Sequence, residues 1–211
     1  MYNKRGFRSK GVSKYMREDL EVLSRDFYNQ PTLILAEKLL GHILVHETEE
    51  GTTSGRIVET EAYLGESDQA AHSYKKRRTK RTEIMFQAPG YVYIYQMHTH
   101  HLINVVAGEV GNPQAILIRA VEPLEGIELM EQRRPVKKFT NLTSGPGKLT
   151  KAFGITKAGY GRTFFEAPLY IAKGHPPSNV VTGTRIGIDN AGEAKDYPYR
   201  FWVEGNKFVS R

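Results

Sequence analysis

The spacing of apolar residues predicts helices at the start of this chain. Apolar side chains recur at helical intervals over residues 20–40, and Pro31 stands where a second helix could begin. Gly41 is suited to ending that helix, and residues 42–46 begin a strand pattern. The opening of the chain is therefore expected to form two helices followed by a strand.

Alternation of apolar and polar residues predicts strands in the middle of the chain. Residues 55–63, GRIVETEAY, alternate with a period of two. The elements expected after them are paired strands over 91–97 and 101–106, a strand over 115–122, a helix over 124–134, a short helix from about Gly145 to Phe153, and short strands to the end. Without an internal repeat or an interdomain linker, this pattern indicates one α+β domain with an antiparallel or mixed sheet flanked by helices.

Residues 1–18 have a different composition from the rest. This stretch contains Lys4, Arg5, Arg8, Lys10, Lys14 and Arg17 and little that is apolar. We expect a flexible basic tail over 1–18 and one folded domain over 19–211. The tail is either an additional weak phosphate contact or an unimportant terminus.

Charge and residue usage narrow the class of protein. There are 30 Lys and Arg against 23 Asp and Glu, a formal net charge of +7, which favours a polyanionic partner. The sequence has no cysteine, which excludes disulfides and a catalytic thiol and fits a reducing cytoplasm. No apolar run approaches the ~20 residues that span a bilayer, and the first residues do not form a secretory signal.

The strand over 55–63 carries the first candidate chemistry. Its period places Ile57, Glu59, Glu61 and Tyr63 on one face. Two carboxylates beside an aromatic ring suit a pocket in which one carboxylate is a general base. The other interpretation is a solvated strand face with an incidental pair of glutamates.

Residues after this strand suit contact with nucleotides. His72 is followed by a basic run, and the predicted hairpin carries Tyr91, Tyr93 and Tyr95 on one face. The run consists of Lys75, Lys76, Arg77, Arg78, Lys80 and Arg81. Such residues could bind phosphates and stack bases, or form a solvated loop and part of an aromatic core.

Two further motifs are weaker. His98, His100 and His101 lie within four residues at the hairpin tip, but their spacing matches no known zinc motif, and we expect neither a metal nor a cofactor. The segment SGPGKL combines glycines, a helix start and Lys148, which suits a phosphate but is no Walker loop.

Taken together, the ordered blocks RIVETEAYLG, DQAAHS, MFQAPGYVYIY, ILIRAVEPLEG and SGPGKL resemble the alkyladenine (3-methyladenine) DNA glycosylases, bacterial type. The resemblance runs from about Leu20 to the end. It implies a curved, mostly antiparallel sheet with a protruding hairpin. It also implies an enzyme that flips alkylated or deaminated purines from duplex DNA and hydrolyses their N-glycosidic bond to start base excision repair. Because no lysine is placed in the pocket, we expect a monofunctional enzyme. We also expect a monomer, which suits an enzyme that slides on DNA, located in the cytoplasm and nucleoid.

The resemblance also assigns roles to residues. It implies that Glu61 is the general base and that Arg119 helps to hold the attacking water. The residues that it implies for the base pocket are Tyr63, His72, Tyr95 and Asn104. The hairpin tip of this chain reads QMHTHH, which is one residue shorter than the alignment with the family implies, and it lacks the tyrosine that the family inserts into the minor groove. We therefore expect His98, or else Met97, to fill the gap left by the flipped nucleotide.

Two other classes of protein remain open from the residues themselves. One is a non-enzymatic nucleic-acid-binding module in which the tyrosine stripe stacks single-stranded bases and Glu61 has no chemical role. The other is a metal-dependent hydrolase centred on the histidine cluster. Release of free purine in the presence of a chelator separates both from a glycosylase.

Overall fold

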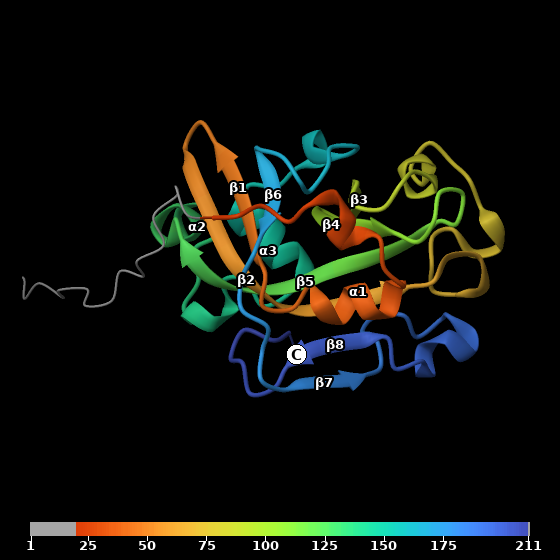
Figure 1. Ribbon diagram of the computed structural model, residues 1–211. Coiled ribbons are helices and arrows are strands. Elements are labelled where there is room, and N and C mark those ends of the chain that lie inside the picture. Colours follow the sequence, from red (N-terminus) through yellow and green to blue (C-terminus); the bar gives the residue numbers. More distant parts are fainter. Residues whose placement is uncertain (1–19, 211) are drawn as a thin grey trace, which may run out of the picture.

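The computed structural model describes residues 20–210, and the predicted basic tail lies outside them (Figure 1). The strands are β1 (Ile43–Thr48), β2 (Gly51–Tyr63), β3 (Val92–Met97), β4 (His100–Ala107), β5 (Gln114–Glu125), β6 (Leu169–Ala172), β7 (Val180–Gly183) and β8 (Arg200–Val203). The α-helices are α1 (Thr32–Lys38), α2 (Ile127–Arg133) and α3 (Pro146–Phe153). Short 3₁₀ helices cover Arg25–Tyr28, Gly65–Ser67, Tyr74–Lys76, Glu83–Phe86, Phe139–Asn141, Lys157–Gly159 and Gly192–Asp196.

All eight strands belong to one curled antiparallel sheet, which confirms the predicted α+β class. The strand order is β3-β4-β5-β2-β1-β6, and β8 pairs with both β2 and β7. At thirteen residues, β2 is the longest strand and pairs with β1, β5 and β8. The predicted hairpin is β3–β4 at one edge of the sheet, with Met97 paired to His100 across its turn.

The pairing of β2 with β5 is irregular where the charged residues lie. Register shifts occur between Ile57 and Glu59 and again between Glu59 and Thr60. A bulge of this kind changes which face the following side chains occupy. The prediction that Ile57 shares a face with the glutamates is therefore wrong: Ile57 packs in the main hydrophobic cluster with Ala62.

Two predicted helices are shorter than expected. The first half of the helical pattern over 20–40 forms only the 3₁₀ helix Arg25–Tyr28, because the residues before it join the sheet. Val22 forms a bridge with Ala172, and the amide of Leu23 donates to the carbonyl of Ile171 at 2.9 Å. Pro31 does precede α1, as predicted.

The helix predicted over 124–134 begins at Ile127. Leu124 and Glu125 end β5 instead, since Glu125 is the register partner of Ser54 on β2. Gly126 separates strand from helix with a φ of +71°. A β-carbon at Gly126 would lie 2.2 Å from the carbonyl oxygen of Thr52, so only glycine fits there.

One continuous hydrophobic cluster joins the sheet to α1 and α3. It contains Leu35 and Ala36 of α1, Leu149 and Phe153 of α3, and inward residues of the strands. Tyr91, Tyr93 and Tyr95 belong to a second, smaller cluster, which confirms that they share a face. Within residues 20–210, no helix has the length and apolar character needed to cross a membrane.

Candidate active site

A cavity of 520 Å³ lies between the hairpin, β2, β5 and the segment 186–191. Its volume falls within the range of ligand pockets. Seven of the side chains that the sequence analysis singled out line it: Tyr63, His72, Tyr93, Tyr95, Met97, Asn104 and Arg119. The structure thus brings together side chains from β2, β3, β4, β5 and the loop after β2.

Glu61 lies directly behind the wall of this cavity and is fully buried. Its carboxylate accepts hydrogen bonds from the Tyr63 hydroxyl at 2.8 Å and from the backbone amide of Ile186 at 2.7 Å. The guanidinium of Arg119 forms an ion pair with it at 3.2 Å. Two of these partners, Tyr63 and Arg119, line the cavity, whereas Glu61 does not. Glu61 is thus separated from the cavity only by the side chains that it holds.

Tyr63 keeps its hydroxyl proton in this environment. Burial raises its pKa well above the usual value, and the nearby Glu61 carboxylate raises it further. A protonated hydroxyl is a donor, which suits its hydrogen bond to Glu61. The ring of Tyr63 also lies against Arg185, whose guanidinium carbon is 4.7 Å from the ring centroid.

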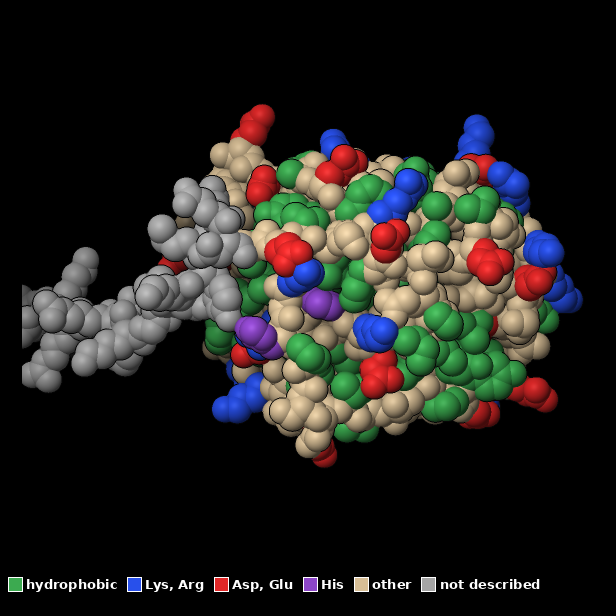
Figure 2. All heavy atoms as spheres, in the orientation of Figure 1, with side chains coloured by type: hydrophobic (Ala, Val, Ile, Leu, Met, Phe, Trp, Pro, Cys, Tyr) green, Lys and Arg blue, Asp and Glu red, His purple; other side chains and the backbone are tan. Residues whose placement is uncertain are grey.

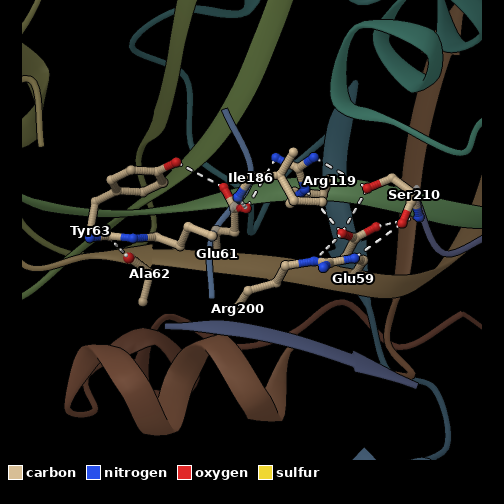
Figure 3. A network of polar contacts seen from close by, with 9 residues as sticks. Glu59, Glu61, Ala62, Tyr63, Arg119, Ile186, Arg200 and Ser210 are labelled. Atoms are coloured by element: carbon tan, nitrogen blue, oxygen red, sulfur yellow. Dashed lines mark hydrogen bonds and ion pairs between the residues drawn. The ribbon is translucent and has the colours of Figure 1, made fainter. Parts of the chain in front are cut away.

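Arg119 is held between two glutamates (Figure 3). Its Nε donates to Glu59 at 3.0 Å, while its Nη1 faces Glu61. Burial acts to lower the pKa of Arg119, but the two carboxylates outweigh it and raise that pKa above its usual value. Arg119 is thus a fixed positive charge at the cavity wall.

Glu59 is occupied by partners that are not part of the cavity. Its carboxylate accepts from Arg200 Nε at 2.7 Å and from both the amide and the hydroxyl of Ser210, at 2.7 and 2.8 Å. Together with Arg119, these donors place three hydrogen bonds on Oε1 of Glu59 and one on Oε2, so this carboxylate is poorly suited to accept a proton from a water in the cavity. Of the two glutamates, the geometry favours Glu61 as a base.

His72, Tyr93 and Tyr95 form an aromatic corner of the cavity. The hydroxyl of Tyr93 lies 2.8 Å from Nδ1 of His72, and the rings of His72 and Tyr95 meet edge to face at 4.5 Å. Burial, reinforced by Arg81 and Arg77, lowers the pKa of His72 to about 4. The imidazole is therefore neutral at physiological pH. Burial also raises the pKa of Tyr95 to about 12.

Asn104 is fixed by the hairpin backbone. It is the register partner of Tyr93, and its side-chain amide donates to the carbonyls of Tyr93 and Leu102 at 3.1 and 3.4 Å. Since the NH₂ group is directed to the backbone, the amide oxygen is the atom left to face other groups. Asn104 is almost fully buried, and its position in the cavity wall is rigid.

Arg185 and Asp68 were not singled out from the sequence, yet they form a buried ion pair under the cavity. The guanidinium makes two hydrogen bonds to the carboxylate, at 2.5 and 2.8 Å, and others to the carbonyls of Ala62 and Ala194. Asp68 also accepts from the amides of Leu64 and Ala70. The pair ties the loop that follows β2 to the segment that contains Ile186.

The hairpin tip ends in the two residues predicted to act as a wedge. Met97 is half exposed and also lines the cavity, while His98 has a φ of +53° in the turn. A positive φ is uncommon for a residue other than glycine. The carbonyl of His98 accepts from the side chain of Gln96 at 2.9 Å, which holds the turn. The structure thus brings Met97, rather than His98, to the cavity.

The basic run forms an exposed loop beside the cavity. In Figure 2, Lys and Arg side chains lie along the upper right edge, where the loop drawn in yellow in Figure 1 runs, with acidic side chains among them. Two of the cations are paired: Lys76 with Glu66 at 3.1 Å, and Arg78 with Glu83 at 2.5 Å. The remaining members of the run are Lys75, Arg77, Lys80 and Arg81, all exposed.

Lys148 lies in the first turn of α3, the helix predicted from SGPGKL. Its Nζ is 3.5 Å from the hydroxyl of Ser144, and Pro146 lines the cavity. The glycine in this turn is required by packing. A β-carbon on Gly147 would lie 2.8 Å from the side chain of His100, so Gly147 allows α3 to pack against the hairpin.

The histidine cluster does not form a metal-binding arrangement within the part of the chain that the structure describes. No group of three or more His, Cys, Asp or Glu side chains over residues 20–210 is placed to hold a metal ion. His100 and His101 are consecutive residues of β4, so they point to opposite faces of the sheet.

Comparison with known proteins places this chain in a family. The sequence model of the methylpurine-DNA glycosylases matches residues 26–207. The chain belongs to this family. Its members are DNA repair enzymes that hydrolyse N-glycosyl bonds, and this chain is such a hydrolase.

Bacterial relatives of similar length support the membership. A protein from Oceanobacillus iheyensis is 62% identical over 195 residues, which cover 92% of this chain and 98% of the relative. One from Bacillus subtilis is 60% identical over 196 residues, covering 93% and 100% respectively. Both are named "Putative 3-methyladenine DNA glycosylase".

Proposed function

We propose that this glycosylase removes alkylated and deaminated purines from duplex DNA by flipping the nucleotide into the cavity and hydrolysing the N-glycosidic bond with a water activated by Glu61. The observation that carries the proposal is the pairing of a buried carboxylate with Tyr63 and Arg119, which both line an aromatic cavity. Chemistry on a base in a duplex requires its extrusion, which costs a few kcal/mol.

Binding of the flipped base rests on the aromatic corner. Tyr63, His72 and Tyr95 contact its faces and edges, and Asn104 limits the space on one side. A purine alkylated on a ring nitrogen carries positive charge, which aromatic faces attract. The neutral imidazole of His72 adds no positive charge that would repel such a base.

In the chemical step a water oxygen forms a bond to C1′ of the sugar while the bond from C1′ to the purine nitrogen breaks. The electron pair of the broken bond leaves with the purine, and the water proton passes to the Glu61 carboxylate. A cationic purine leaves as a neutral base, whereas a deaminated purine must take up a proton as it leaves. Arg119 holds the water and the carboxylate in place.

The product of this route is an intact abasic site. No lysine occurs among the described residues that line the cavity, so an amine that could form a Schiff base with the sugar is not at hand. Borohydride should therefore trap no covalent adduct between protein and DNA during turnover.

Contact with DNA outside the cavity falls to the basic loop and the hairpin tip. Lys75, Arg77, Lys80 and Arg81, with Lys148 on α3, supply phosphate contacts that do not depend on sequence. Met97 is the proposed wedge, because it is exposed at the tip and borders the cavity, with His98 beside it in the turn. We propose a monomer that associates with the nucleoid.

The test is release of free bases from methylated duplex DNA in excess EDTA, measured by chromatography. The wild type should release methylpurine, and Glu61→Gln should release none while its affinity for DNA is retained. Glu66→Gln, a change of an exposed glutamate, should behave as the wild type. Tight DNA binding without release by the wild type would instead indicate a binding module, and normal release by Glu61→Gln would exclude Glu61 as the base.

A further inference from the structure

We propose that Glu59 and Ser210 are positioning residues that fix the guanidinium of Arg119 against Glu61, so that the segment after β8 forms part of the active site. The proposal rests on the function assigned above to Glu61 and Arg119. It concerns side chains that do not line the cavity and that the sequence did not connect with each other.

The three nitrogens of Arg119 are each directed to a different oxygen (Figure 3). Its Nε donates to Glu59 Oε1 at 3.0 Å and its Nη2 to Ser210 Oγ at 3.2 Å, while its Nη1 lies 3.2 Å from Glu61 Oε1. A guanidinium is planar, so fixing two of its nitrogens sets the direction of the third. Glu59 and Ser210 therefore determine where Nη1 points.

Ser210 has a defined hydrogen-bonding direction. Its hydroxyl can donate only one proton, and the acceptor is Glu59 Oε1 at 2.8 Å. A lone pair of the same oxygen accepts from Arg119. The backbone amide of Ser210 donates to the other oxygen of Glu59 at 2.7 Å. The serine thus couples the orientation of the carboxylate to that of the guanidinium.

Arg200 on β8 completes the anchor. Its Nε donates to Glu59 at 2.7 Å and its Nη2 to the carbonyl of Ser210 at 3.1 Å. The guanidinium carbon of Arg200 stands 4.5 Å from the centroid of the Trp202 ring, which supports it from one side. Glu59 is fully buried, so its charge depends on these partners for compensation.

The site therefore contains two carboxylates with different tasks. Glu59 accepts hydrogen bonds from Arg119, Arg200 and Ser210. One oxygen of Glu61 interacts with Arg119 and the amide of Ile186, and the other accepts from the Tyr63 hydroxyl. Without the anchor, Arg119 could rotate about its side-chain bonds and leave Glu61. An error of this kind in a positioning group lowers the chemical step rather than the binding of DNA.

The test compares Ser210→Ala with Ser210→Thr, which keeps the hydroxyl. Single-turnover excision of methylpurine should fall about 10-fold in Ser210→Ala, because the variant loses the hydroxyl's hydrogen bonds to Arg119 and Glu59. DNA affinity should stay within about 2-fold of the wild type, and Ser210→Thr should recover most of the rate. Ser178→Ala, at an exposed serine, is the control.

Thermal unfolding of each variant separates positioning from stability. If Ser210→Ala lowers Tm but its folded protein excises at the wild-type rate, the proposal is wrong. If that variant does not fold, Arg200→Gln provides the second measurement, since it weakens the anchor of Glu59 without touching Arg119; a wild-type excision rate there would also overturn the proposal.

Glu61→Gln is assayed in the same experiment to distinguish the two proposals. Normal excision by Glu61→Gln would mean that the proposed function is wrong, whatever Ser210→Ala does. Loss of excision in Glu61→Gln together with a normal rate in Ser210→Ala would reject the positioning role alone.

Discussion

The hydroxyl of Tyr63 donates a 2.8 Å hydrogen bond to Oε2 of Glu61, two residues earlier on the same strand. Residues separated by two point to the same face of a strand, which places the ring and the carboxylate side by side. Tyr63 thereby has two separable properties: a ring that lines the cavity and a hydroxyl that orients Glu61.

Tyr63→Phe should separate these properties. The variant keeps the ring but leaves Oε2 of Glu61 without its donor, and we expect single-turnover excision to fall about 10-fold. Binding of damaged DNA should change little, because stacking is retained. Tyr95→Phe is the matched control, since it removes a hydroxyl from the same cavity but not the one that holds Glu61. An equal loss in both variants would show that the hydrogen bond to Glu61 is not the cause.

Protonation of His72 should destabilise the fold in acid. The unfolded chain takes up this proton near pH 6.5, whereas burial holds the pKa of the folded state at about 4. Between these values the unfolded state binds more protons, so stability falls as pH falls, by about 1.4 kcal/mol per pH unit at most for this one group.

Urea unfolding at a series of pH values from 7 to 4 measures this effect. His72→Gln should show a shallower decline than the wild type. His42 and His46 also have pKa values lowered by burial, so part of the decline should remain in the variant. Identical slopes for the wild type and His72→Gln would contradict the assignment to His72.

Loss of the buried pair between Asp68 and Arg185 should be costly. Asp68→Asn leaves the buried guanidinium of Arg185 without its counter-charge, and we expect a loss of about 3–5 kcal/mol in the free energy of unfolding. Glu66 lies two residues before Asp68 and forms an exposed ion pair with Lys76. Glu66→Gln breaks this pair and should cost less than about 1 kcal/mol in the free energy of unfolding. Chemical denaturation of the two variants checks the difference, and equal costs would refute it.

The exposed cations of the basic loop should differ in their contribution to DNA binding. Arg77→Gln and Arg81→Gln should each reduce the slope of log K against log salt by about 0.9, the value for one lost phosphate contact. Arg78 is already bound to Glu83 and lies over the ring of Phe86, so Arg78→Gln should reduce it less. Fluorescence anisotropy with undamaged duplex at several salt concentrations measures the slopes. A larger effect of Arg78 than of Arg77 and Arg81 would contradict this ranking.

The sequence predicted well where a local pattern decides the structure. The period of two over residues 55–63 placed Glu59, Glu61 and Tyr63 together, and the tyrosine stripe of the hairpin lies on one face as expected. The prediction failed where pairing with a strand distant in sequence determines the local structure. The helical pattern near Val22 gives way to pairing with Ala172, and Leu124 continues β5 because β2 is there to pair with it.

The partners of the candidate site were missed for the same reason. Three hydrogen-bonding partners of β2 and of the loop after it lie more than a hundred residues further along the chain. They are Arg185, Ile186 and Ser210. Neither periodicity nor a short motif records such a contact. A signal was nevertheless present at Asp68, because it opens the block DQAAHS, one of those that resemble the family. The bulge at Glu59, which moves Ile57 to the core, leaves no mark in the alternation.

The bond between Ser210 and Glu59 joins residues separated by 151 positions in the chain. Contacts of such separation carry a large entropy of loop closure and tend to form late in folding. We therefore expect partly folded forms to have the sheet and the hairpin before Arg119 is oriented. Excision would then appear only once the segment after β8, which contains Ser210, has docked against Glu59. In that case the enzyme cannot cleave glycosidic bonds while its basic loop is already formed but its fold is still incomplete.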